Sequence, residues 1–268
     1  MLRELRKNFR SVKGIALGVL TLLGGSGIAL LIAKAYEFKR EELGQVSPEQ
    51  IHEARLAILR KAYEVDTANW LADAPDALLG LLNFTIWLTP LFIALMGFDS
   101  IAPDIQHRSV RYWTLRSRRA SYFVGKWAGL WTTVSIVTFA LDLLVWVVTI
   151  ARGDAPAAAT LSWGMKFWLI SLPLSAIWCG IAVLISSLFR SPIVALLTTF
   201  GAFFVLWVLF LIGAFAKWDP LLYVYPNHYD YFMLNPRVDR VGIGVLASFA
   251  MTALYVVTGS TLFARRDV

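Results

Sequence analysis

Charged residues are scarce in this sequence of 268 residues. They make up 16% of the chain, whereas 58% of the residues are hydrophobic, and the mean hydropathy is +0.63. A soluble domain carries about 25% charged residues. The shortage of charge therefore excludes an ordinary water-soluble fold and implies that much of the chain lies in lipid.

Cysteine and histidine are also rare. The single cysteine, Cys179, lies in an apolar segment, so no intrachain disulfide can form. The three histidines are scattered and no His-Glu-x-x-His motif occurs, so we expect no metal site. Ser26 stands between glycines, as in intramembrane serine proteases, but no histidine lies at membrane depth to act as its base. Close packing of small residues explains this motif better.

A phosphate-binding loop is missing as well. Gly125-Lys126 is followed by Trp127, and no glycine precedes it at the spacing that such a loop requires. We therefore expect the chain to carry no cofactor and to bind no ATP itself. The net charge of +7 does not indicate nucleic acid, because basic residues that flank apolar segments are what membrane topology requires.

Six apolar runs are present, and each reaches the roughly 20 residues that cross a bilayer. The predicted fold is an all-α integral membrane protein, a six-transmembrane-helix bundle that forms a single transmembrane domain over residues 1–268. Pro192 after Arg190 and Ser191 favours a tight reversal between the fourth and fifth spans. The six runs cover roughly residues 14–33, 77–98, 124–150, 165–189, 193–216 and 241–264.

Basic residues concentrate in the segments that this alternation places on one side of the membrane. They precede the first span within residues 1–13, fill residues 108–126, and recur at Arg190 and at Arg265 and Arg266. Positive residues near span ends stay on the cytoplasmic side. We therefore predict that both termini are cytoplasmic, with residues 1–13 forming an amphipathic segment at the inner surface before a retained first span.

Two outer loops are long enough to have structure of their own. In the first, residues 34–76, Ser47 is a good N-cap, Pro48 suits the first helical position, and the apolar spacing predicts a helix to about Val65. This helix is interpreted as a solvated lid or strut, or else as a contact for a partner or substrate. The second, residues 217–240, is rich in Tyr and Pro and fits an interfacial cap or a partly re-entrant segment.

Asp142 is the one clear acid within a predicted span. Carboxylates inside a membrane are costly, which makes them functional hypotheses by default. Three roles fit equally well: lining a translocation path, pairing with a neighbouring Lys or Arg, and hydrogen bonding to hydroxyls across the bundle.

The inner loop, residues 99–123, is too polar to face lipid. Pro103 and Asp104 suit a helix start, Val110, Trp113 and Leu115 provide an apolar side, and five arginines supply charge. Such an amphipathic helix serves either as a membrane-surface helix or as a docking element for a cytosolic partner, and the residues alone leave both open.

This loop resembles the first cytoplasmic loop of ABC-2-type permeases. The pattern there reads Asp-x-Ile-x-x-Glu, three residues, Gly-Thr, an apolar run, Ser-Arg and then Gly-Lys. The chain departs from it by lacking the Gly, by lacking a Pro before Arg119, and by being one residue shorter. A sub-branch linked to multicopper-enzyme maturation or antibiotic export is similar over residues 109–119. The matching positions are Asp99, Ile101, Asp104 for the Glu, Arg108-Ser109 for Gly-Thr, Arg119, and Gly125-Lys126.

The resemblance implies the transmembrane permease subunit of an ATP-driven exporter with type V exporter-like architecture, in a bacterial inner membrane. It implies no catalysis by the chain itself. ATP and Mg would bind to a separate cytosolic ABC ATPase, and a second permease, identical or related, would complete the transporter. A principal coupling helix is expected from about Asp104 to Arg119, with a second contact at residues 190–192. The expected ATPase-coupling residues are Asp99, Asp104, Arg108, Arg111, Arg116, Arg118, Arg119 and Arg190.

Two other classes of function remain. An ion-coupled secondary transporter or channel would use Asp142 as its ion-binding group, and Asp142 is also the candidate for a translocation path in an ATP-driven permease. A membrane anchor for an enzyme complex would use the outer helix at Ser47 to hold its partner.

Overall fold

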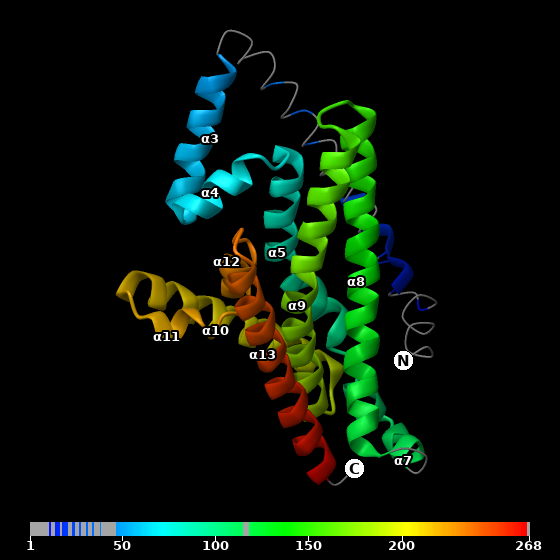
Figure 1. Ribbon diagram of the computed structural model, residues 1–268. Helices are drawn as coiled ribbons and strands as arrows, with labels where there is room; N and C mark the ends of the chain where they lie inside the picture. The colour runs from blue at the N-terminus through cyan, green and yellow to red at the C-terminus, as the bar shows by residue number, and fades with distance from the viewer. Residues whose placement is uncertain are drawn as a thin grey trace.

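The computed structural model describes residues 47–114 and 118–266, together with residues 11, 14–16, 18–20, 23–24, 27, 31, 34 and 38. Within these residues the regular structure is helical. Five helices are long and apolar enough to cross a membrane, and they confirm the second to sixth predicted spans. Half of the first predicted span, residues 14–33, lies outside the described residues. The five helices are α5 (Asp76–Gly97), α8 (Arg119–Ala151), α9 (Ala157–Leu188), α10 (Pro192–Ala216) and α13 (Val238–Arg265) (Figure 1).

Two helices are longer than the apolar runs that predicted them. α8 begins at Arg119 and α9 begins at Ala157, several residues before the predicted starts. At 1.5 Å per residue, each is about 50 Å long, against about 30 Å for the hydrocarbon core. Hydropathy marks only the lipid-embedded part of a helix, whereas good helix formers such as the alanines at 157–159 extend it into the aqueous phase.

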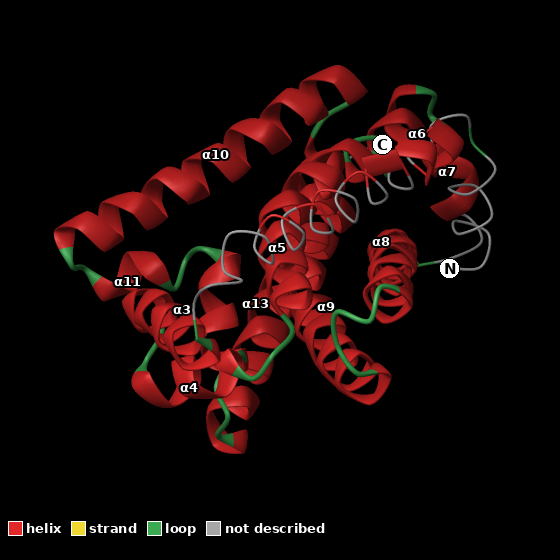
Figure 2. Ribbon diagram, turned by 90° about the horizontal axis from the view of Figure 1, so that it is seen from above, coloured by secondary structure: helices red, strands yellow, loops and turns green. Residues whose placement is uncertain are grey.

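α9 is the central helix of the bundle. It packs against α5, α8 and α13. Of its most apolar 18-residue stretch, 83% is buried, compared with 17% for the corresponding stretch of α10 and of α13. Seen from above, α8 is viewed end-on beside α9, whereas α10 is viewed along its length at the edge of the molecule (Figure 2). α10 therefore leans away from the other helices and presents most of its surface to lipid or to another protein.

Hydrogen bonds from tryptophans join α8 to α9. Trp127 Nε1 donates to the Ala176 carbonyl at 3.1 Å, and Trp131 Nε1 donates to the Leu172 carbonyl at 3.0 Å. The two indole rings stack with centroids 5.6 Å apart. Because lipid offers no partner for an indole N–H, these bonds favour the paired helices over separated ones.

The outer loop contains two helices, α3 (Pro48–Ala62) and α4 (Val65–Ala72). The predicted N-cap is confirmed: the Ser47 hydroxyl accepts from the Gln50 backbone N–H, and the Gln50 side chain accepts from Ser47 in return. α3 ends before the predicted Val65 because Tyr63 adopts an extended backbone. The sequence analysis did not predict α4.

Arg55 fastens these two helices to the start of α5. Its guanidinium donates to the Leu71 carbonyl at 3.2 Å and to the Ala74 carbonyl at 2.5 Å, and forms an ion pair with Asp76 at 3.1 Å. The pair of helices is thus held by hydrogen bonds as well as by the packing of Leu59 and Leu71.

The segment between α10 and α13 is re-entrant. It contains α11 (Asp219–Leu222), the 3-10 helix η1 (Pro226–Tyr229) and α12 (Asp230–Met233). Asn227 in η1 is buried: its Oδ1 accepts from Trp178 Nε1 at 2.8 Å and its Nδ2 donates to the Ile86 carbonyl at 3.0 Å. Trp178 and Ile86 each lie about 15 Å along their helices from the ends at Leu188 and Gly97. The segment therefore reaches in between α5 and α9, where Asn227 bonds to both helices.

Pro90 explains why Asn227 bonds to Ile86. Pro90 lies inside α5 and has no N–H, so the carbonyl four residues earlier, that of Ile86, loses its helical donor. A carbonyl without a donor is costly inside a membrane. Asn227 supplies the missing donor, and this bond attaches the re-entrant segment to α5.

We predict that Asn227→Ala lowers the free energy of unfolding by about 3 kcal/mol, because both the Ile86 carbonyl and the Trp178 N–H lose their partner. Pro90→Ala restores an N–H next to Ile86, so it should recover about 1 kcal/mol in the Asn227→Ala background and less in the native one. Equilibrium unfolding in mixed micelles measures the free energy of unfolding of the native chain, the two single variants and the double variant. Strictly additive effects would contradict the pairing.

Candidate functional site

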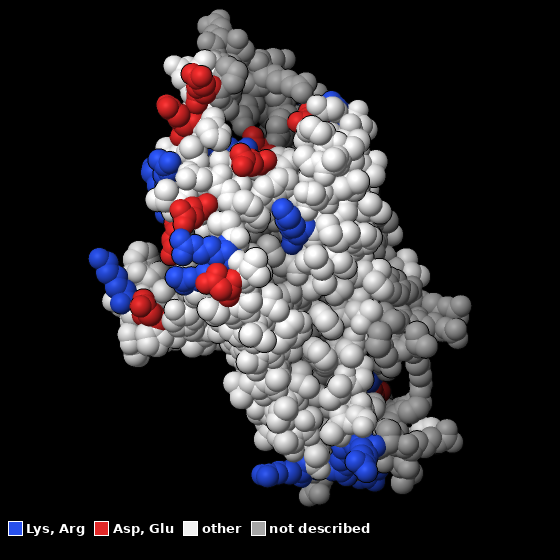
Figure 3. Space-filling model, in the orientation of Figure 1, with Lys and Arg blue, Asp and Glu red and all other residues white. Residues whose placement is uncertain are grey.

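The two ends of the molecule differ in charge. α5, α9 and α13 end, and α8 and α10 begin, at the lower end in Figure 1. On the face shown in Figure 3, Lys and Arg gather at this end, whereas acidic and basic residues alternate around α3 and α4 at the other end. We call the lower end the basic end.

The inner loop forms a bent pair of short helices at the basic end. α6 (Ala102–Gln106) and α7 (Ser109–Thr114) replace the single helix predicted from Asp104 to Arg119. The single-helix prediction is wrong because Arg108 adopts a left-handed backbone, with φ of 55°. The ABC-2 pattern has Gly there, which adopts this conformation freely, whereas another residue pays about 1–2 kcal/mol. We call residues 99–114 the elbow; Arg116 lies outside the described residues.

Ser186 of α9 holds the first part of the elbow. Its hydroxyl oxygen accepts from the backbone N–H groups of Ile101 at 3.0 Å and Ala102 at 3.1 Å, and the hydroxyl donates to the Phe98 carbonyl at 2.7 Å. One buried side chain thus satisfies three backbone groups between α5 and α6. The elbow cannot move far without either breaking these bonds or moving α9.

Asp104 connects the elbow to α8. Its Oδ2 forms an ion pair with Lys126 Nζ at 2.8 Å and accepts from the Tyr122 hydroxyl, and its Oδ1 accepts from the Ser109 hydroxyl at 3.0 Å. The Lys126 side chain is only 5% exposed. The acidic position and the Gly-Lys position of the ABC-2 pattern are therefore in direct contact, although 21 residues separate them.

Arg119 and Arg266 connect the ends of three spans. Arg119 at the start of α8 donates to the Ala264 carbonyl at 2.9 Å and the Arg266 carbonyl at 2.7 Å, and the Arg266 guanidinium donates to the Ser187 carbonyl of α9. Arginines at the end of a helix satisfy its last carbonyls and complement its dipole. α8, α9 and α13 are thereby joined at the basic end.

The predicted coupling residues fall into two groups. Asp104 and Arg119 make the internal contacts above, and Asp99 lies half-buried between α5 and α6. The second group is exposed, and within the part of the chain described here no acid forms an ion pair with Arg108, Arg118 or Arg190. The pKa of the Arg266 guanidinium is lowered, first by its burial and second by the positive charge of Arg190. The exposed residues are Arg108, Arg111, Arg118 and Arg190.

Asp142 does not join this site. It lies in α8 well above the basic end, 6% exposed, with Leu81 of α5 and Phe167 of α9 among its neighbours. Sequence reasoning also missed the parts played by Ser186, Tyr122 and Arg266. A serine within an apolar run is a weak signal for such a role, because most intramembrane serines bond only to their own helix.

We predict unequal effects from removing the two partners of the Asp104 ion pair. Asp104→Asn leaves Lys126 charged and buried, which should lower the free energy of unfolding by about 3 kcal/mol. Lys126→Met should cost less, since Asp104 is the more exposed partner and keeps the Ser109 and Tyr122 donors. Unfolding in micelles should rank the single variants in this order, with Asp104→Asn/Lys126→Met recovering part of the larger loss; the reverse order would count against a buried lysine.

The comparison with known families agrees with this architecture. The model of a family described as ABC-2 family transporter protein matches residues 1–268. A comparison with curated proteins gives no match. The family match confirms the resemblance seen in the inner loop, and with the five apolar helices it establishes a multi-pass membrane protein. The chain belongs to the ABC-2 family of transporter proteins, as a membrane permease component.

Proposed function

We propose that the chain is the transmembrane permease subunit of an ATP-driven exporter, and that its elbow couples a separate cytosolic ABC ATPase to the helix bundle. The observation that carries the proposal is that the two sides of the elbow differ. Its surface carries exposed arginines, whereas its inner side is bonded to α8 through Asp104 and to α9 through Ser186.

The exposed cations suit an acidic partner surface. Arg108, Arg111 and Arg118 extend around the elbow, and Arg190 is exposed at the turn between α9 and α10. Because like charges held near one another repel, a partner surface that carries carboxylates is attracted to these arginines. The attraction speeds association and fixes the orientation of the bound partner. Arg190 would supply the second, smaller contact.

The internal bonds supply a route for force. A displacement of the elbow pulls on α8 through a buried ion pair and on α9 through backbone hydrogen bonds, and Arg119 with Arg266 carries it to α13. Closure of the ATPases would then tilt these helices as a body and switch the bundle between inward-open and outward-open states. ATP and Mg would be bound by the ATPase alone.

The basic end faces the cytoplasm in this proposal, because positive residues near span ends are retained there. In this proposal residues 14–33 form the first of six spans, and both termini are cytoplasmic. The membrane is the bacterial inner membrane. A second permease, identical or related, completes the transporter, and the largely exposed α10 offers apolar surface for it.

An ion-coupled transporter based on Asp142 is the second candidate, favoured by the burial of that acid. The two candidates differ in their energy source. Transport that survives ATP depletion and collapses with the proton or sodium gradient would favour the ion-coupled transporter.

We predict that Arg108→Glu/Arg111→Glu disrupts assembly with the ATPase. The tagged chain, purified from its own cells, should carry Mg-ATP-dependent phosphate release, and the double charge reversal should reduce it about tenfold or more. Lys61→Glu, an exposed charge reversal on α3 at the opposite end, is the matched control and should leave it unchanged. A native chain that carries no such activity, or equal activity in all three chains, contradicts the proposal.

A further inference from the structure

A small chamber lies next to Asp142 in the middle of the bundle. It is enclosed by α5, α8 and α9, and its volume of about 10 Å³ is that of a single water-sized sphere. Asp142, Thr85 and Ser171 line it, and each of them is less than 10% exposed. The remaining lining is apolar or aromatic apart from Gly164.

Among the described residues, no side chain donates a hydrogen bond to the side-chain oxygen atoms around the chamber, which is also lined by Trp146 with its indole N–H. Asp142 makes no hydrogen bond or ion pair with the residues that the structure describes, and the Thr85 hydroxyl is fully buried without a partner. Ser171 donates to the Trp168 carbonyl at 2.7 Å, so its oxygen remains free to accept. No other titratable or charged side chain from α5, α8 or α9 lines the chamber.

A bare carboxylate in such surroundings is strongly disfavoured, since no basic side chain lines the chamber to compensate its charge. The chamber therefore favours a positively charged occupant. The space holds about one water molecule and is lined by hydroxyl and carboxylate oxygens, the groups that can replace the hydration shell of a small monovalent cation.

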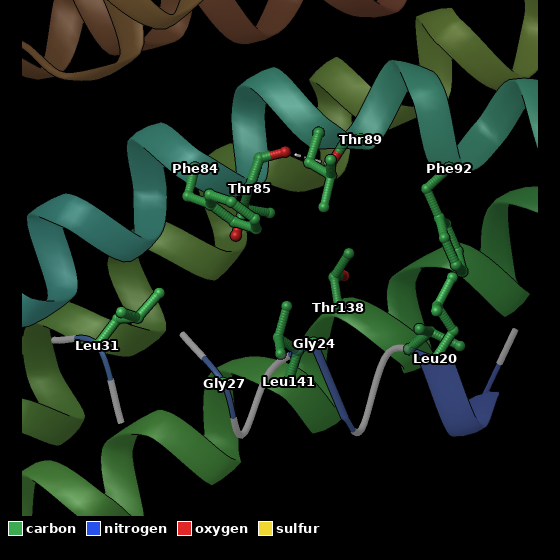
Figure 4. A pocket seen from close by; sticks show the side chains of 12 residues that line it. Leu20, Gly24, Gly27, Leu31, Phe84, Thr85, Thr89, Phe92, Thr138 and Leu141 are labelled. Carbon is green, nitrogen blue, oxygen red and sulfur yellow. Dashed lines mark hydrogen bonds between the residues drawn. The ribbon is translucent and has the colours of Figure 1, made fainter. Parts of the chain in front are cut away.

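The chamber borders a larger, apolar cavity. This cavity, of about 410 Å³, lies between α5, α8 and residues Leu20, Gly24, Gly27 and Leu31. Figure 4 shows Thr85 and Thr89 of α5 facing Thr138 and Leu141 of α8 across it. Thr85 lines both cavities, and Leu141 directly precedes Asp142, so the two spaces adjoin at Thr85.

We propose that Asp142, Thr85 and Ser171 form a binding site for one small monovalent cation, either an alkali cation or a proton carried with one water molecule. The site rests on the second candidate function, ion coupling at Asp142, and requires no ATPase contact. It lies far from the elbow, so its loss should leave assembly with the ATPase intact.

The test is thermal unfolding of the full chain in lipid nanodiscs. A ligand that binds only the folded state raises the unfolding temperature with its concentration. Sodium, potassium and choline chlorides are compared at equal ionic strength, and the pH is varied from 8 to 6 in choline. An alkali site predicts a rise in sodium or potassium over choline, and a proton site predicts a rise as the pH falls.

The variants assign either response to this chamber. Asp142→Asn keeps the shape without the charge and should abolish the response, whereas Asp239→Asn, an exposed acid at the start of α13, should keep it. For an alkali cation, Thr85→Val and Ser171→Ala should each raise the half-maximal concentration at least tenfold. If Asp142→Asn does not fold, Thr85→Val and Ser171→Ala decide, and an alkali response that is unchanged in both variants overturns the proposal. A native chain whose unfolding temperature responds to neither salt nor pH also overturns it. A response retained by folded Asp142→Asn overturns it as well.

Discussion

The structure depends on one constraint: inside lipid, a polar group has no partner except another part of the protein. The Ile86 carbonyl, freed by Pro90, accepts a hydrogen bond from Asn227, and the Trp178 indole N–H donates to the Asn227 side chain. The indole N–H of Trp127 donates to the Ala176 carbonyl of α9. Each of these solutions joins segments that are distant in sequence, so satisfying the constraint also fixes which helices are neighbours.

α9 is the helix through which the parts of the molecule meet. It bonds the elbow through Ser186, the re-entrant segment through Trp178, and the end of α13 through the Ser187 carbonyl. A movement that begins at the basic end therefore reaches the re-entrant segment along one rigid element. This continuity gives a physical basis for the proposed coupling of an ATPase at the basic end to the rest of the helix bundle.

Composition predicted the helical spans because lipid demands about 20 apolar residues per crossing, and this demand leaves a strong signal. The helix break at Arg108 was missed, since a left-handed backbone at an arginine depends on its surroundings and not on its own preference. The motif residues Asp104 and Lys126 could be named but not paired. The bond between Asn227 and the Ile86 carbonyl had no signal, because its partners lie on different elements and one of them is backbone.

The central claim is that the elbow is the surface that touches the ATPase. A photo-crosslinking amino acid placed at Tyr112 of α7 and, separately, at the exposed Tyr223 of the re-entrant segment tests it in intact cells. The account predicts that position 112 crosslinks to a nucleotide-hydrolysing subunit and that position 223 does not. Crosslinking of that subunit from position 223 alone, or only to lipid from position 112, would contradict the account.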